Sequence, residues 1–293
     1  MADLELQSLA GGREQFLSWV AEFRPELHRY CARMMGSAID GEDVVQEALA
    51  KAFYQLSQSL TLPPLRPWLL RIAHNTALDH LKRYDRKHVE PLDALDAETL
   101  GDGAADPAAV RAALATFLEL PVLQRSAVIL KDVLGLSNED IASALQTTVP
   151  AVKAGLVRGR AKLKQVTGPA PTATTLSAEL RATLDQYVSR FNARDWDGLR
   201  SLLAKEVELD LVSRAARRGA EVGQYYGNYA KADVTLTLGL AEGRPVLGVF
   251  PPGATRPAYV IQLEVGADGV RFIRDYRYVP YLAAELVFEP LRG

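Results

Sequence analysis

The sequence predicts a multidomain protein in which two all-α domains are followed by an α+β domain. The chain has 293 residues, which is more than one ordinary domain contains. Apolar residues recur at helical spacing up to about residue 166, whereas runs typical of strands begin only after residue 203. Two stretches without such periodicity, 90–107 and 167–176, separate the three parts and are predicted to be linkers.

The composition excludes several classes of protein. Hydrophobic residues (48%) and charged residues (24%) are present in globular proportions, which excludes a wholly disordered or fibrous chain. The net charge of −2 excludes a uniformly basic nucleic-acid binder but leaves room for local basic patches. Cys31 is the only cysteine, so a disulfide framework and a cysteine zinc site are excluded. The four histidines lack the HExxH spacing, and we expect neither a metal nor a cofactor.

The sequence also bears on where the protein works. No apolar run approaches the ~20 residues that a membrane span needs. The first residues lack the basic flank and apolar stretch of a secretory signal. We therefore expect no membrane partner and a cytoplasmic location.

The first helical domain is expected over residues 10–89. Phe16, Val20, Phe23 and Leu27 recur at three- and four-residue steps and predict its first helix. Acidic residues at 40–43 lie where a helix dipole favours them and predict the start of the second, and a proline-rich loop at 59–67 precedes the third. The buried side of the second helix is expected to hold Val44, Leu49, Ala52, Phe53 and Leu56.

The second helical domain, residues 108–166, has the pattern of a helix-turn-helix. Ser137 followed by Asp140 predicts the start of a short helix, and Thr148 can cap the next one, with Pro150 in its first turn. The later helix carries a cationic run that includes Lys153, Arg158 and Arg160. Charge alone favours a solvated basic face, but the combination with the capping box and the turn spacing favours a helix that lies in the major groove.

The third domain, residues 177–293, changes character along its length. Helical spacing holds to about residue 203. Strand-like runs then occupy 207–212, 234–240, 245–250, 259–265 and 270–279, with glycine-containing breaks between the last four. This part is therefore predicted to be α+β.

Three segments of the helical part resemble a known family. They are DGEDVVQEALAKAF (40–53), RPWLLRIAHNTALDHLKR (66–83), and LPVLQRSAVIL, LGLSNEDIASAL and VPAVKAGLVRGRAKL within 120–163. In this order they resemble the extracytoplasmic-function group of bacterial sigma-70 family RNA polymerase sigma factors. The resemblance implies a sigma region 2 bundle over 10–89 and a sigma region 4 helix-turn-helix over 108–166.

The resemblance also implies which residues contact the partners, core RNA polymerase and promoter DNA. The second helix would dock on the polymerase clamp through Asp43, Gln46 and Glu47. The loop at 57–66 would help hold a flipped base, and the third helix would serve the −10 element through Arg71, His74, Asn75, Lys82 and Arg83. The −35 element would be read through Thr148, Lys153, Arg158 and Arg160.

The reading helix departs from the family pattern. The family often has Ser-Arg after the lysine, whereas Ala154 and Gly155 follow Lys153 here. A glycine inside a helix costs about 0.5–1 kcal/mol relative to alanine. The promoter sequence therefore cannot be transferred from other members.

The segment from Leu184 to Leu211 resembles the opening of SnoaL-like domains of the NTF2 fold. That fold implies a cone in which a curved antiparallel sheet wraps around helices and encloses a pocket. Candidate pocket residues are Tyr187, Phe191, Asp210 and Tyr225. The alternative is that the aromatic residues belong to the core and that Asp210 points outward from its strand.

These observations favour a sigma factor that binds core polymerase, recognises −10 and −35 elements and aids promoter opening. The third domain would regulate it in cis, through an intramolecular contact or a small-molecule ligand, and no enzymatic activity is expected. The alternatives are an isomerase- or cyclase-like enzyme or ligand sensor with a DNA-binding appendage, and a repressor or activator that works without polymerase. A simple repressor needs neither the 40–53 nor the 66–83 segment.

Overall fold

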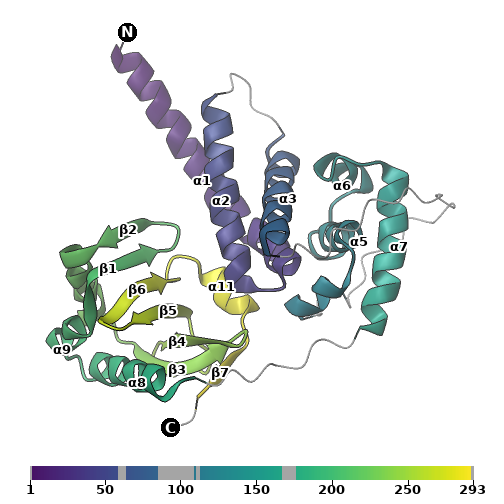
Figure 1. Cartoon of the computed structure of the whole chain (residues 1–293). Helices are drawn as coiled ribbons and strands as arrows, with labels where there is room; N and C mark the ends of the chain where they lie inside the picture. Colours follow the sequence, from purple (N-terminus) through teal and green to yellow (C-terminus); the bar gives the residue numbers. More distant parts are fainter. Residues whose placement is uncertain (1, 59–63, 85–108, 110–112, 167–175, 292–293) are drawn as a thin grey trace. The chain divides into compact units, whose positions relative to one another are not determined.

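The computed structural model describes residues 2–58, 64–84, 109, 113–166 and 176–291. The chain divides into two compact units, Met1–Pro169 and Ala170–Gly293 (Figure 1). The predicted linker at 90–107 and nearly all of that at 167–176 lie outside the described residues, as does the middle of the 57–66 loop.

The first unit begins with α1 (Ala2–Met35), α2 (Ala38–Ser57) and α3 (Leu65–Tyr84). Gly36, at a φ of 69°, ends α1, and the Ser37 hydroxyl accepts a hydrogen bond from the Asp40 amide to cap α2. The backbones of α1 and α2 then approach closely, because a Cβ on Gly41 would lie 2.5 Å from the Cα of Ala32. The three predicted helices are therefore present.

The rest of this unit contains the predicted helix-turn-helix. It comprises η1 (Leu114–Glu119), α5 (Val122–Val128), the π-helical turn η2 (Ile129–Val133), α6 (Asn138–Ala144) and α7 (Val149–Gln165). The Ser137 hydroxyl accepts from the Asp140 amide at 3.0 Å, and the Thr148 hydroxyl accepts from the Ala151 amide at 3.3 Å. Both predicted caps are confirmed.

The two helical parts, which the sequence presents as separate domains, share one hydrophobic core. Buried polar groups also join them. The Tyr30 hydroxyl of α1 lies 2.8 Å from His74 Nδ1 of α3 and donates to the Ser126 hydroxyl of α5 at 3.3 Å. The buried Arg125 guanidinium donates to the carbonyl of Met34 at 2.7 Å. Residues 20–58, 64–84 and 113–163 thus form a single packed body.

The second unit is α+β, as predicted. Its elements are α8 (Ala178–Asn192), α9 (Trp196–Ser201), β1 (Leu203–Leu211), β2 (Ala215–Arg218), η3 (Gly219–Gln224), α10 (Tyr226–Ala230), β3 (Thr235–Ala241), β4 (Arg244–Phe250), β5 (Tyr259–Gly266), β6 (Gly269–Asp275), α11 (Pro280–Glu285) and β7 (Phe288–Pro290). α8 packs against β3 (Figure 1). The order of two helices followed by strands matches the expectation from the SnoaL-like resemblance.

The strands form one open sheet in the order β2-β1-β6-β5-β4-β3-β7. The sheet was expected to be antiparallel, and every pairing is antiparallel except that between β1 and β6. β1 lies beside β6, the last long strand of the chain. The residues between these two parallel strands, which include β2 to β5, form the crossover connection. Alternating residues of β1 (Val207, Leu209 and Leu211) are buried, so the other face of the strand carries Glu208 and Asp210.

Two glycines of α7, Gly155 and Gly159, differ in how closely they approach α5. A Cβ on Gly159 would lie 2.7 Å from Val128 Cγ2 and 3.1 Å from the Gln124 carbonyl oxygen, whereas a Cβ on Gly155 would meet nothing closer than 3.7 Å. We expect Gly159→Ala to lower the free energy of unfolding by about 1–3 kcal/mol through overpacking. Gly155→Ala should be neutral or raise it by up to about 1 kcal/mol, because alanine favours the helix. Urea unfolding of both variants checks this, and equal effects would contradict the packing described.

Candidate functional site

The outward face of α2 carries the three residues expected to contact polymerase. Asp43, Gln46 and Glu47 are all partly exposed and lie within one helical turn. The same face continues to Phe53 and Tyr54, which are 47% and 67% exposed. Phe53 was expected on the buried side, and that expectation is wrong, because the buried stripe ends at Ala52. The face is therefore polar at one end and aromatic at the other.

Both carboxylate oxygens of Glu47 have partners on α2 or α3. Oε2 accepts from His80 Nε2 at 2.7 Å, while Oε1 lies 2.8 Å from Lys51 Nζ and accepts from Arg83 Nη2 at 3.4 Å. The hydrogen bond from Lys51, followed by that from His80, lowers the pKa of Glu47 to about 2, against the opposing effect of partial burial. Glu47 therefore joins α2 to α3 through a network that sequence spacing alone did not reveal.

The residues expected to serve the −10 element fall into two groups. Asn75, Lys82 and Arg83 are exposed on α3, and Arg71 is partly exposed. His74 is buried in the core against Tyr30 and Ser126. Desolvation lowers the pKa of His74 to about 4, so the imidazole is neutral at neutral pH. His74 therefore does not belong to the surface expected to contact the −10 element, because its ring satisfies polar groups of the core.

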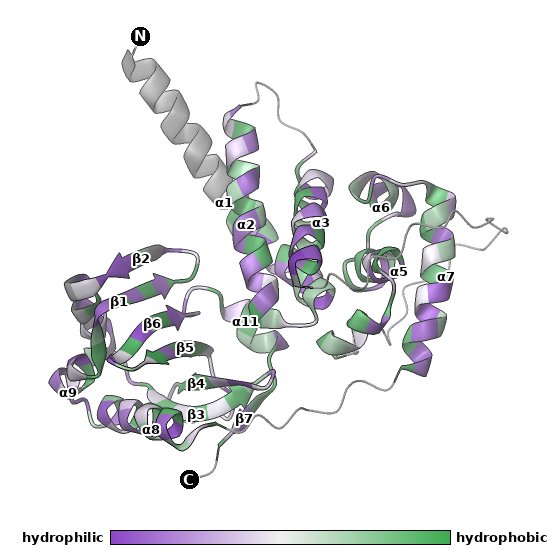
Figure 2. Cartoon of the chain, in the orientation of Figure 1, coloured by the Kyte–Doolittle hydropathy of each residue, from purple (hydrophilic) through white to green (hydrophobic). Residues whose placement is uncertain are grey.

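The residues expected to read the −35 element are divided in the same way. Arg158 is exposed and Lys153 partly exposed on α7. Thr148 uses its hydroxyl as the helix cap, and Arg160 donates to both oxygens of the buried Asp132, at 3.0 and 2.6 Å. Arg160 therefore ties α7 to η2. Figure 2 shows α7 changing from hydrophobic in its first turns to hydrophilic toward its end, where Lys162 and Lys164 add further exposed charge.

The candidate pocket residues of the second unit are not brought together around one cavity. Tyr187, Phe191 and Tyr225 are fully buried. The Tyr187 hydroxyl lies 3.0 Å from that of Tyr226, and the Phe191 ring packs edge-on against Trp196 and Tyr229. Asp210 lies on the other face of the sheet, 3.1 Å from Arg274 Nε. The aromatic residues fill the core and Asp210 points outward, as the alternative interpretation held.

The buried acid of this interior is Asp275, which the sequence reasoning missed. Its carboxylate accepts from the hydroxyls of Tyr225 and Tyr229, both at 2.8 Å, and from the Arg277 amide at 2.8 Å. Burial raises the pKa of Asp275, and these hydrogen bonds oppose the shift. No local signal points to this arrangement, because the two tyrosines lie some fifty residues earlier in the chain.

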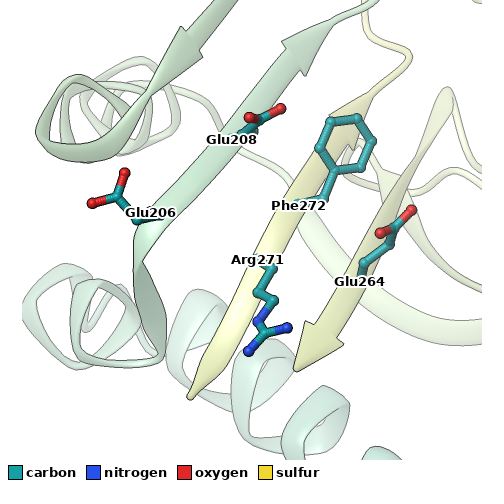
Figure 3. Close-up of a pocket in the computed structure, with 5 residues that line it drawn as sticks. All are labelled: Glu206, Glu208, Glu264, Arg271 and Phe272. Atoms are coloured by element: carbon teal, nitrogen blue, oxygen red, sulfur yellow. The ribbon is translucent and has the colours of Figure 1, made fainter. Parts of the chain in front are cut away.

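A hollow of about 420 Å³ opens on the outer face of this sheet. Glu206 and Glu208 of β1, Arg271 and Phe272 of β6 and Glu264 of β5 line it (Figure 3). None of the candidate pocket residues contributes to it. Within the described residues, no three histidine, cysteine or acidic side chains are grouped so as to hold a metal ion, and no helix there has the length and apolarity to cross a bilayer.

Comparison with known proteins places these features in a family. Models of Sigma-70 region 2 and Sigma-70 region 4 match residues 19–87 and 111–163, which correspond to the α1–α3 bundle and to η1–α7. The ECF RNA polymerase sigma factor SigG of Mycobacterium tuberculosis is 30% identical over 300 residues, covering 89% of this chain and 80% of that protein. The chain belongs to the ECF RNA polymerase sigma factors. It is a transcription initiation factor, and its family implies core RNA polymerase and promoter DNA as partners.

Solved structures overlap both parts of this ECF sigma factor. The structure of SigJ, an extracytoplasmic-function sigma factor of Mycobacterium tuberculosis, covers 88% of this chain and 95% of its own, with 20% identity and a TM-score of 0.36. A protein of Kribbella flavida that is named as a ketosteroid isomerase covers 32% of this chain and 74% of its own, with 25% identity and a TM-score of 0.27.

Arg158 and Arg160 of the ECF sigma factor form a matched pair for mutation. Arg158→Ala should leave the free energy of unfolding unchanged, weaken promoter binding and reduce the salt dependence of binding by about one counterion. Arg160→Ala strands the buried Asp132 and should lower the free energy of unfolding by about 3 kcal/mol. Thermal unfolding and salt-dependent DNA binding separate the two effects, and an Arg160→Ala variant of normal stability would contradict the role given to this ion pair.

His74 predicts a pH dependence of stability. Its pKa is about 4 in the folded state and near 6.5 when unfolded, so the unfolded chain binds more protons between these values. Stability is full above pH 6.5 and is lost as the pH falls toward 4. The contribution of His74 should fall by about 2 kcal/mol between pH 7 and pH 5. Denaturant unfolding of His74→Gln over this range should give a flatter profile than the native chain, and an unchanged slope would refute the burial argument.

Proposed function

We propose that this sigma factor reads the −35 element with α7 and binds the −10 element with the exposed end of α3, while its C-terminal unit regulates it in cis. The observation that carries the proposal is the division of charge on α7. Arg158, Lys162 and Lys164 face solvent, whereas Val152, Leu156 and Leu163 are buried against the rest of the unit. Arg158 and Lys162, one turn apart, form an outward cationic pair on the second helix of a helix-turn-helix, which is suited to phosphate and major-groove contact.

For polymerase binding, the support comes from the face of α2. Asp43 and Gln46 present polar groups that suit a basic partner surface, and Tyr54 extends this face with an exposed aromatic ring. Exposed tyrosines of this kind often anchor protein interfaces. We assign the polymerase contact to this face, with Glu47 at its edge toward α3.

For the −10 element, the supporting residues are the exposed ones on α3. Lys82 and Arg83 lie in the last turn, Asn75 lies nearer the middle and Arg71 is partly exposed. These side chains can contact the phosphates and base edges of an unpaired strand. The loop expected to hold a flipped base lies largely outside the described residues.

For regulation in cis, the supporting feature is the packing of the C-terminal unit. The interior of this unit is packed with buried aromatic side chains around Asp275, which favours regulation through its surface over binding of a ligand within the cone. The candidate acid of the enzyme alternative, Asp210, lies on the other face of the sheet from the candidate tyrosines. The acid that does meet tyrosines, Asp275, is fully buried under Tyr225 and Tyr229. We therefore favour a regulatory surface.

Run-off transcription with bacterial core polymerase tests the proposal. The full chain and a form ending after residue 168 are compared on candidate promoters, including the one upstream of its own gene. We expect both forms to initiate, and the initiation rates to differ at least twofold because the C-terminal unit acts in cis. Equal rates would remove the regulatory role, while failure of both forms to bind core polymerase or to initiate would overturn the assignment of the two interfaces.

A further inference from the structure

The polymerase-facing helix and the −10-facing helix share a set of ion pairs. Glu47 of α2 meets His80 and Arg83, which lie one turn apart on the same side of α3. Lys51, four residues after Glu47, approaches α3 as well, donating to the Thr76 hydroxyl at 3.3 Å and lying 3.7 Å from Asp79 Oδ2. Glu47, which is expected to contact polymerase, therefore contacts Arg83, which is expected to contact the −10 strand.

The members of this network differ in how readily they can change partners. Arg83 is 60% exposed and lies 3.4 Å from Glu47, so it can leave the carboxylate at little cost. His80 is only 14% exposed and holds the other oxygen at 2.7 Å. Lys51 stays anchored by Thr76 and Asp79 whether or not Glu47 is present. Arg83 is thus the member that can exchange Glu47 for a phosphate.

We propose that Glu47 is a positioning residue that couples polymerase binding to −10 strand binding through Arg83. In the free chain its carboxylate restrains Arg83. When a cationic side chain of polymerase takes up part of that carboxylate, Arg83 is released toward the DNA backbone. The inference rests on the proposed assignment of α2 to polymerase and of the end of α3 to the −10 strand.

Thermodynamic reciprocity gives this exchange a measurable form. If polymerase frees Arg83 for DNA, then DNA that occupies Arg83 must free Glu47 for polymerase by the same factor. Exposed ion pairs are weak, so the coupling should be modest, about threefold in each dissociation constant. A purely structural role for Glu47 predicts a different result, since its loss would weaken folding and leave the coupling factor unchanged.

The experiment measures that factor with the full-length chain. Its dissociation constant for core polymerase is measured with and without a single-stranded oligonucleotide of about 20 nucleotides, taken from the −10 region of a promoter that the chain uses in run-off transcription. The native chain should bind polymerase about threefold more tightly when the oligonucleotide is present. Glu47→Gln should bring this ratio to about one, and the matched control Asp43→Asn, an acid one turn earlier on the same face, should keep it.

A second variant, Arg83→Ala, tests the same coupling if Glu47→Gln fails to fold. Arg83→Ala changes an exposed side chain and should also bring the ratio to about one, because no arginine remains to be exchanged. In addition, Glu47→Gln should steepen the salt dependence of oligonucleotide binding by the free chain by about one counterion, because Arg83 is no longer neutralised.

A threefold ratio that survives in both variants overturns the coupling. A native chain that binds both partners with a ratio of one overturns it too, and leaves the proposed interfaces standing. A native chain that does not bind polymerase fails at the earlier step.

Discussion

Arg125 is the residue on which the helical unit depends. Its guanidinium is buried between the two halves and donates to three backbone carbonyls, those of Met34, Leu118 and Leu120. Burial lowers the pKa of Arg125, because the site disfavours the charged guanidinium, while the nearby Glu119 carboxylate opposes the shift. The end of α1 and the C-terminal end of η1 supply the carbonyl acceptors that offset that cost. The position of the helix-turn-helix on the α1–α3 bundle follows from this requirement.

Several other charged groups are likewise satisfied by partners within the molecule. Arg160 and Asp132 neutralise each other, and Glu47 is shared between helices. In the C-terminal unit, Asp275 is held by tyrosine hydroxyls, and Arg277 lies 4.0 Å above the Tyr229 ring. The exposed charged side chains assigned to binding lie on the outward sides of α2, α3 and α7.

Features set by neighbours in the sequence could be predicted. The caps at Ser137 and Thr148 depend on contacts three residues away, and the helical order and α+β character follow from periodicity. The predicted antiparallel sheet was wrong at one pairing, β1 with β6, because strand order depends on long-range contacts. The same limit applies to the candidate site: nothing near His74 indicates that Tyr30 and Ser126, 44 residues before it and 52 after, will enclose it. The short strands β2 and β7 were missed because they lack apolar alternation.

The shared core of the helical unit sets a limit on its reach. The −35 and −10 elements are centred about 25 base pairs apart, which corresponds to roughly 85 Å along B-form DNA. A compact body of 169 residues has a radius of gyration of about 15 Å. The closed unit therefore cannot touch both elements at once. The contact between α5 and the α1–α3 bundle therefore has to open before the promoter complex forms. The free energy of that contact is a cost that the binding energy of polymerase must offset.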